Sequence, residues 1–184
     1  MTSTRYYGLT GLNASGKGSV AELLIAAGFD YHSLSDAIRQ VLAERGLEPT
    51  RDHMIVTGRE LREKGGPGAL ATLIASRLRP GVPAVIDSVR TPGEVAVLRA
   101  LPGFRLLGVT APEAVRFDRI RARGRVGDPQ DLETFRRHEA AELTGNDAGQ
   151  QLIATAALAD QQIANDGDRG ALEAAVAALA ADRS

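Results

Sequence analysis

The chain has 184 residues, a length that suits a single domain with a sizeable hydrophobic core. Its formal net charge is −1 and no apolar run approaches the length of a membrane span, so we expect neither nucleic acid nor a membrane as partner. It contains no cysteine, which excludes disulfides, thiolate catalysis and cysteine-ligated zinc and fits a cytoplasmic protein.

The first predicted element is a strand over 5–10, and a glycine-rich loop follows it. The loop reads Gly-Leu-Asn-Ala-Ser-Gly-Lys-Gly-Ser, a G-x-x-x-x-G-K pattern, and it leads into a helix predicted over 17–27. Its glycines let backbone N–H groups point at phosphate oxygens, and the start of the helix adds its dipole. Lys17 is one of only two lysines among 22 basic residues. The pattern predicts a phosphate site made by Gly11, Asn13, Ala14, Ser15, Gly16, Lys17, Gly18 and Ser19.

The rest of the chain alternates short apolar runs with longer amphipathic ones, which is typical of a parallel sheet with crossover helices. Further strands are predicted over 29–32, 83–88, 105–110 and 159–164. Further helices are predicted over 34–45, 51–64, 68–79, 92–100, 111–123, 130–143 and 169–181. We therefore expect one α/β domain over 1–184, a three-layer α/β/α P-loop fold with a five-stranded parallel sheet. Its predicted parts are a core (1–32, 80–115 and 145–184), an acceptor-binding helical insertion (33–79) and a short arginine-rich lid region (116–144).

An acidic residue, Asp87, ends the predicted strand over 83–88. If this strand neighbours the first one, the carboxylate lies near the phosphate loop, where it can hold Mg²⁺ through water. The alternative is a strand-end aspartate that caps the next turn. Because the phosphate loop is present, we favour the magnesium role.

Two arginines follow the ends of predicted strands. Arg39 lies on the helix after the second strand, and Arg90 lies just beyond Asp87. Both are expected at the carboxyl edge of the sheet, where the guanidinium fork suits a second phosphate group. Arg59 and Arg62 follow on the next helix, and for Arg62 a solvated surface position is an equal alternative.

A third group of arginines precedes and follows a break at Gly124 and 127–129. Arg116, Arg119 and Arg123 fall at i, i+3 and i+7 of one predicted helix and so share a face. A lid that closes arginines over phosphates explains this better than an RNA-binding patch, which would need more aromatic residues nearby. The group consists of Arg116, Arg119, Arg121, Arg123, Arg125, Arg136 and Arg137.

A turn, Asn-Asp-Gly at 165–167, follows the last predicted strand. Loops in this place commonly border the adenine in P-loop folds. A turn without a ligand is an equal alternative.

The pattern resembles the nucleoside monophosphate kinase group, which includes adenylate kinases and dephospho-CoA kinase. Residues 16–19 are similar to the adenylate-kinase form of the loop, in which glycine follows the lysine. Residues 33–39 resemble that family's acceptor-site helix, whose arginine grips the monophosphate, and residues 87–90 resemble its strand-end Asp-Gly-Phe-Pro-Arg. Arg119 and Arg123 match the two arginines at the start of its lid.

Further segments resemble the same kinase group or particular families within and near it. Residues 131–137 match the arginine helix that follows the lid, and residues 165–167 are similar to the closing motif of dephospho-CoA kinases. The closest resemblance is to small kinase-like proteins common in archaea, on residues 59–69 (Arg-Glu-Leu-Arg-Glu-Lys-Gly-Gly-Pro-Gly-Ala) and 163–167 (Ile-Ala-Asn-Asp-Gly).

Two positions depart from these patterns. Gly18 stands where ordinary P-loops have the serine or threonine that ligates Mg²⁺, which leaves Ser19 as the nearest hydroxyl. Ser88 and Val89 replace Gly-Phe-Pro before Arg90, so the base pocket of adenylate kinases is not reproduced.

The resemblance implies an enzyme that transfers the γ-phosphoryl group of ATP to a nucleoside or deoxynucleoside monophosphate, with Mg²⁺ as cofactor. The alternatives are transfer to a ribose hydroxyl, as in dephospho-CoA kinase with Asp36 as base, or a nucleotide-binding regulatory module without transferase activity. We expect a monomer or homodimer. The catalytic residues implied are Lys17, Asp87, Arg119, Arg123 and Arg136. ATP would be bound by the loop with Arg119, Asn165 and Gly167, the acceptor by Ser35, Asp36, Arg39, Arg59 and Arg90, and the metal by Ser19 and Asp87.

Overall fold

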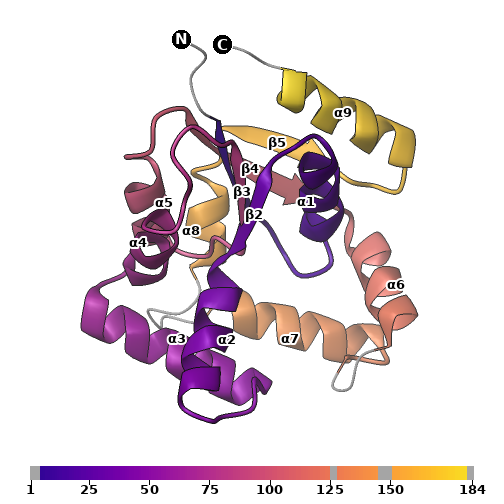
Figure 1. The fold of residues 1–184 in the computed structure, drawn as a ribbon. Helices are drawn as coiled ribbons and strands as arrows, with labels where there is room; N and C mark the ends of the chain where they lie inside the picture. The colour runs from indigo at the N-terminus through magenta and orange to yellow at the C-terminus, as the bar shows by residue number, and fades with distance from the viewer. Residues whose placement is uncertain (1–4, 125–127, 145–150, 182–184) are drawn as a thin grey trace.

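The structure is a computed structural model that describes residues 5–124, 128–144 and 151–181 (Figure 1). Its strands are β1 (Tyr6–Thr10), β2 (Asp30–Ser33), β3 (Ala84–Asp87), β4 (Phe104–Thr110) and β5 (Gln161–Ala164). Its helices are α1 (Lys17–Ala26), α2 (Leu34–Glu44), α3 (Arg51–Gly65), α4 (Ala69–Ala75), α5 (Pro92–Leu98), α6 (Glu113–Arg123), α7 (Leu132–Thr144), α8 (Leu152–Ala156) and α9 (Arg169–Ala181).

The five strands form one parallel sheet in the order β2-β3-β1-β4-β5. β1 lies at the centre, with Tyr6 paired to Ala84 of β3 on one side and to Phe104 of β4 on the other. All five residues of β1 are buried, as expected of a strand covered on both faces. The predicted five-stranded parallel sheet is confirmed, and β3 is the neighbour of β1 on which the role of Asp87 depends.

Helices cover both faces of the sheet, so the predicted three layers are confirmed (Figure 1). One core cluster joins the sheet to α1 and α9, and it includes Leu24, Val85 and Leu107. The other joins the sheet to α2, α4 and α5, and it includes Ile86 and Leu106. Successive strand residues thus point to opposite cores, which is the period of two that a strand imposes.

Local signals in the sequence set several helix ends. Ser33 caps α2 by accepting a hydrogen bond from the N–H of Ser35, and Thr50 caps α3 in the same way. Gly46, with φ of +68°, follows α2 and supplies the left-handed residue that commonly ends a helix. Pro112 precedes α6 as its N-cap, one residue earlier than a first-turn proline would lie.

Two helices differ from the predicted elements: one is additional and one is shorter than expected. The helix α8 was not predicted, because five residues are too few to display a helical period. The helix predicted over 68–79 ends at Ala75.

Arg125 and Gly127, which belong to the predicted lid, lie outside the described residues. Within the described ranges no helix is long and apolar enough to cross a membrane.

Candidate functional site

The glycine-rich loop connects the buried end of β1 to the start of α1, at the centre of the sheet. Three of its residues have positive φ angles: Gly11 (+138°), Ala14 (+60°) and Gly16 (+97°). A side chain at Gly11 would place its Cβ 2.2 Å from the carbonyl oxygen of Val109 in β4, so only glycine fits there. No side chain caps the first turn of α1, which leaves its N–H groups available to an anion.

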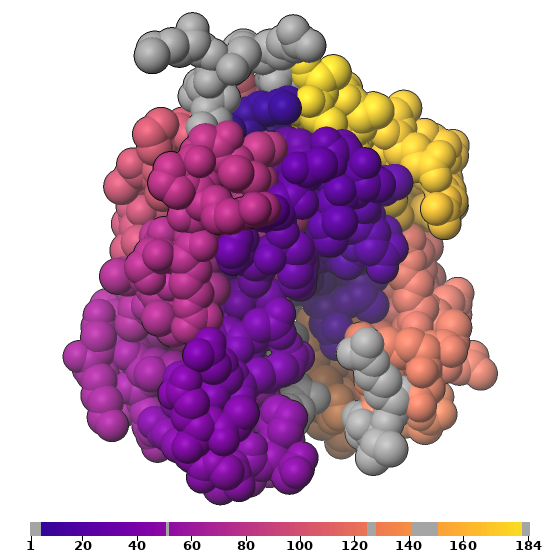
Figure 2. All heavy atoms as spheres, viewed as in Figure 1, coloured from indigo at the N-terminus to yellow at the C-terminus, as the bar shows by residue number. Residues whose placement is uncertain are grey.

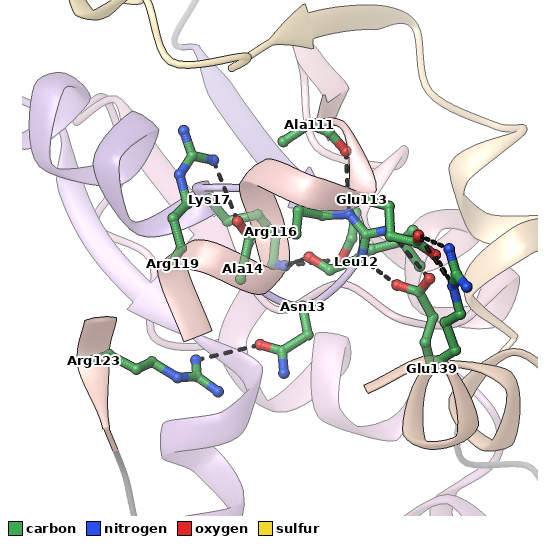
Figure 3. Close-up of polar contacts among 12 residues, drawn as sticks. Leu12, Asn13, Ala14, Lys17, Ala111, Glu113, Arg116, Arg119, Arg123 and Glu139 are labelled. Carbon is green, nitrogen blue, oxygen red and sulfur yellow. Dashed lines mark hydrogen bonds and ion pairs between the residues drawn. The ribbon is translucent and has the colours of Figure 1, made fainter. Parts of the chain in front are cut away.

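Lys17 folds back over the loop that precedes it. Its ammonium donates hydrogen bonds to the carbonyl oxygens of Gly11, at 2.8 Å, and Leu12, at 3.0 Å (Figure 3). The positive charge therefore lies within the curve of the loop, among the N–H groups that would surround a phosphate.

Asn165, which follows β5, packs directly against this loop. Its side-chain amide donates to the carbonyl oxygen of Ser15 at 3.1 Å, and its Oδ1 accepts from Arg119 at 2.9 Å. A Cβ on Gly16 would lie 1.8 Å from the Asn165 amide nitrogen, so the loop glycine is required for this contact. Arg119 also donates to the carbonyl oxygens of Ala14 and Ser15 (Figure 3). The loop, α6 and the segment after β5 thus form one network.

The Asn165→Ala variant tests the contribution of this network to stability. Asn165 is buried, and the change removes its hydrogen bonds to Ser15 and from Arg119. We expect the free energy of unfolding to fall by about 1–2 kcal/mol. Urea unfolding measures this change. The exposed neighbour Asp166 is the matched control, because Asp166→Ala should leave the unfolding curve unchanged, and equal effects of the two changes would contradict the assignment.

Asp87 lies at the carboxyl end of β3, beside the phosphate loop. Its Oδ1 accepts from the N–H of Ser88 at 2.6 Å, and its Oδ2 accepts from the hydroxyl of Tyr31 at 3.3 Å. Ser88 has a φ of +67°, so the chain turns sharply here through a left-handed residue that is not glycine. Partial burial and the Asp87 carboxylate raise the pKa of Tyr31 above its ordinary value.

The residues around Asp87 fit a magnesium ion of the kind bound with a nucleotide. The described residues contain no cluster of three or more His, Asp or Glu side chains that could enclose a metal ion. Mg²⁺ in nucleotide sites usually keeps several waters and takes only one or two carboxylates besides the phosphates, so a single half-buried Asp87 suits it. Ser19 is exposed on the first turn of α1, and a Cβ at Gly18 would meet no atom within 4 Å.

The predicted acceptor residues come from α2, from α3 and from the segment after β3. Arg39 is exposed on α2 and forms an ion pair with Asp36 one turn earlier. Arg90 is half-buried after β3, and Arg59 is half-buried on α3. Because β2 and β3 are neighbours, α2 and the segment that holds Arg90 both start at the same edge of the sheet. The possibility that Arg62 is a solvated surface residue is wrong, since its side chain is buried against Glu94.

The helix α6 brings two of its arginines to the phosphate loop and directs a third elsewhere. Arg119 contacts the loop as described. Nη1 of Arg123 lies 3.4 Å from Oδ1 of Asn13 in the loop (Figure 3). Nη2 of Arg123 pairs with Oδ1 of Asp128 at 2.8 Å. Arg116, expected on the same face, instead pairs with Glu139 of α7 and donates to the carbonyl of Ala111. Its burial explains the difference, because a buried guanidinium needs a carboxylate partner.

Arg136 binds a residue of α6 and not the loop in the contacts that the structure shows. It is exposed on α7 and forms an ion pair with Glu113 of α6. Together with the Arg116–Glu139 pair, this contact holds the two helices of the predicted lid against each other. Figure 2 shows the surface hollowed between the α2 segment and α6, with indigo atoms of the N-terminal part of the chain at the floor.

Tyr31 and Glu94 were not predicted from the sequence, which left the role of Arg62 open. Tyr31 carries no spacing signal, and Arg62 could not be distinguished from a surface arginine. Glu94 could have been found, because Thr91 and Glu94 form the T-x-x-E pattern of a capping box, which the structure contains.

The fold and the loop define a P-loop protein, and residues 8–142 match the family described as AAA domain. A UPF0200 protein of Pyrococcus abyssi is 36% identical over 165 residues, which cover 86% of each chain. The chain belongs to the UPF0200 family. Its fold is similar to that of TT1252 from Thermus thermophilus (TM-score 0.64, 22% identity, 98% of each chain). It is also similar to that of shikimate kinase from Bacteroides thetaiotaomicron (TM-score 0.61, 14% identity, 95% of this chain and 96% of the other).

Proposed function

We propose that the protein is an ATP-dependent phosphotransferase whose acceptor is a nucleoside or deoxynucleoside monophosphate. The observation that carries the proposal is the arrangement of cationic residues around the phosphate loop. Arg119 and Arg123 of α6 contact the loop on one side. On the other side, α2 with Arg39 and the segment with Arg90 start at the ends of β2 and β3. A protein that only bound ATP would have no need of this second group.

The chemistry follows from the charges at each position. Lys17 and the loop N–H groups would hold the β- and γ-phosphates, and the bound Mg²⁺ would neutralise charge between them. Asp87 would hold the metal through water, with Ser19 as the nearest hydroxyl. Arg39 and Arg90 would bind the acceptor phosphate, with Ser35, Asp36 and Arg59 close to it in the insertion. Arg119, Arg123 and Arg136 would stabilise the negative charge that spreads over the transferred group. An acceptor that is already a phosphate anion needs no general base.

The similar structures support phosphotransfer in general but not the choice of acceptor. The protein from Bacteroides thetaiotaomicron is a shikimate kinase, and another with this fold is an adenylylsulfate (APS) kinase of Mycobacterium tuberculosis with a TM-score of 0.52. Both names describe phosphotransferases with small acceptors.

A panel of acceptors tests the proposal. ATP consumption with Mg²⁺ should rise when one of deoxycytidylate, cytidylate, uridylate or adenylate is added, and a diphosphate product should appear. Turnover with dephospho-CoA instead would favour transfer to a hydroxyl. Slow hydrolysis that ignores every acceptor would indicate a nucleotide-binding regulatory module and contradict the proposal.

The two acceptor arginines give a separate prediction. Changing Arg39 or Arg90 to alanine should weaken acceptor binding by about 2–3 kcal/mol, because each removes a charge-assisted hydrogen bond to phosphate. ATP affinity should stay as in wild type, because neither residue lies on the phosphate loop. Titrations of each substrate measure the two affinities. Loss of ATP affinity with acceptor affinity kept would place these arginines in the wrong half of the site.

A further inference from the structure

An ion pair shielded from solvent joins the insertion to the core of the protein. Arg62 of α3 donates from Nε, at 3.2 Å, and from Nη2, at 2.8 Å, to Oε1 of Glu94 in α5. The two side chains are 6% and 0% exposed. Such a pair loses the hydration of both charges, so it persists only where further hydrogen bonds satisfy the buried atoms.

The second oxygen of the same carboxylate holds the segment that carries Arg90. Oε2 of Glu94 accepts from the backbone N–H of Arg90 at 2.8 Å and from that of Thr91 at 3.1 Å. The hydroxyl of Thr91 accepts in return from the N–H of Glu94, which completes the capping box of α5. One carboxylate therefore connects the guanidinium of Arg62 to the backbone of Arg90.

The chain beyond α3 is also fitted tightly to the start of α5. Thr91 donates from its hydroxyl to the carbonyl oxygen of Pro67 at 3.1 Å. A Cβ on Gly93 would come within 2.5 Å of Cβ of Pro67 and 2.9 Å of its carbonyl carbon, and one on Gly68 would come within 2.8 Å of the Gly93 carbonyl oxygen. The two segments thus touch along their backbones, and they leave no room for a side chain between them.

Arg59, a proposed acceptor residue, lies one turn before Arg62 on α3, so an anchored Arg62 also fixes the helical face that carries Arg59. We propose that Arg62 and Glu94 are positioning residues. They hold Arg90 and the Arg59 face of α3 in one fixed arrangement, so the acceptor-phosphate site is already formed before the acceptor binds. This inference rests on the proposed function of Arg90 and Arg59 as acceptor-phosphate ligands.

Steady-state kinetics with the acceptor that wild type uses test the positioning role. Arg62→Met and the milder Glu94→Gln should each raise the acceptor KM on the order of tenfold, because the arginines lose their alignment. The KM for ATP should stay within about twofold, because the phosphate loop is not touched. Arg45→Met is the matched control. It removes an exposed ion pair between Arg45, at the end of α2, and Glu60, which lies on α3 like Arg62. It should change neither the acceptor KM nor the KM for ATP.

A double-mutant cycle separates positioning from a general loss of stability. Because part of the effect of Arg62 passes through Arg90, Arg62→Met should raise the acceptor KM of an Arg90→Ala variant by a smaller factor than it raises that of wild type. Amide hydrogen exchange of the protein without substrates gives a readout that needs no activity. Exchange at the N–H groups of Arg90 and Thr91 should become faster in Arg62→Met, although Arg62 touches neither group, and should not change in Arg45→Met.

The outcomes distinguish the two proposals. If wild type transfers phosphate to an acceptor but Arg62→Met and Glu94→Gln leave its KM unchanged, or if the cycle is additive, the positioning role is wrong and the proposed function stands. Unchanged exchange at Arg90 and Thr91 in Arg62→Met also overturns it. If wild type transfers phosphate to no acceptor of the panel, the proposed function is wrong and the positioning role falls with it.

Discussion

Replacing Lys17 by alanine should abolish phosphoryl transfer and leave the fold intact. The ammonium lies within the phosphate loop, where the carbonyl oxygens of Gly11 and Leu12 hold it, and it takes no part in either hydrophobic core. Its loss removes the mobile positive charge that would meet the β- and γ-phosphates. We expect no detectable transfer, with a change in the free energy of unfolding of no more than about 1 kcal/mol.

The second lysine of the chain provides the control. Lys64 is exposed near the end of α3, so Lys64→Ala removes the same charge and should leave turnover as in wild type. Phosphoryl-transfer assays and thermal unfolding of both variants make the comparison. Near wild-type turnover by Lys17→Ala would overturn the assignment of the loop.

The Arg123→Ala variant should lower kcat far more than it weakens ATP binding. Its Nε and Nη2 bind Asp128, whereas Nη1 lies 3.4 Å from Oδ1 of Asn13 in the loop, so we expect the guanidinium to meet the transferred phosphate mainly in the closed state. An interaction made mainly in the transition state appears in kcat. The loss should be on the order of 10³-fold, as for other arginines that neutralise a transferred phosphoryl group. Single-turnover kinetics and ATP titration measure the two quantities.

Arg121 is the matched control for Arg123 on the same helix. It lies two residues away, on another side of α6, with its guanidinium 5.8 Å from the centre of the Phe117 ring. Arg121→Ala should leave kcat unchanged. A bisubstrate analogue that joins the two phosphate sites should also protect the chain from trypsin after Arg123, and ATP alone should protect it less. A kcat of Arg123→Ala within a few-fold of wild type would mean that this arginine is only a solvated surface charge.

Much of the fold was predictable because its signals are local. A buried strand such as β3 reads as a short apolar run, and Gly46 marks the end of a helix through its own backbone preference. The alternation of such runs with helical ones specifies a parallel sheet. The strand order did not follow from these signals, because it depends on which apolar faces pack together, and that is decided by residues far apart in the chain.

The same difference between local and long-range signals explains which parts of the candidate site could be predicted. The phosphate loop was found in the sequence because seven consecutive residues, 11–17, carry the pattern. The roles of Arg62 and Arg116 could not be found, since their partners, Glu94 and Glu139, lie 32 and 23 positions away. Burial determines whether an arginine serves a ligand or a neighbouring carboxylate, and a single sequence gives no direct measure of burial. The hydrogen bond from the side chain of Asn165 to the loop was not predicted either, because it joins residues 150 positions apart.

The contact between Asn165 and Ser15 has a consequence for how the protein is made. The two residues are 150 positions apart, so the loop leaves the ribosome long before its packing partner does. The same delay applies to α9, which packs against α1. A nascent chain that lacks the last strand would expose part of the core that covers α1, and its phosphate loop would lack a buried hydrogen bond. Nucleotide binding by the growing chain should therefore begin only after β5, Asn165 and α9 have been synthesised.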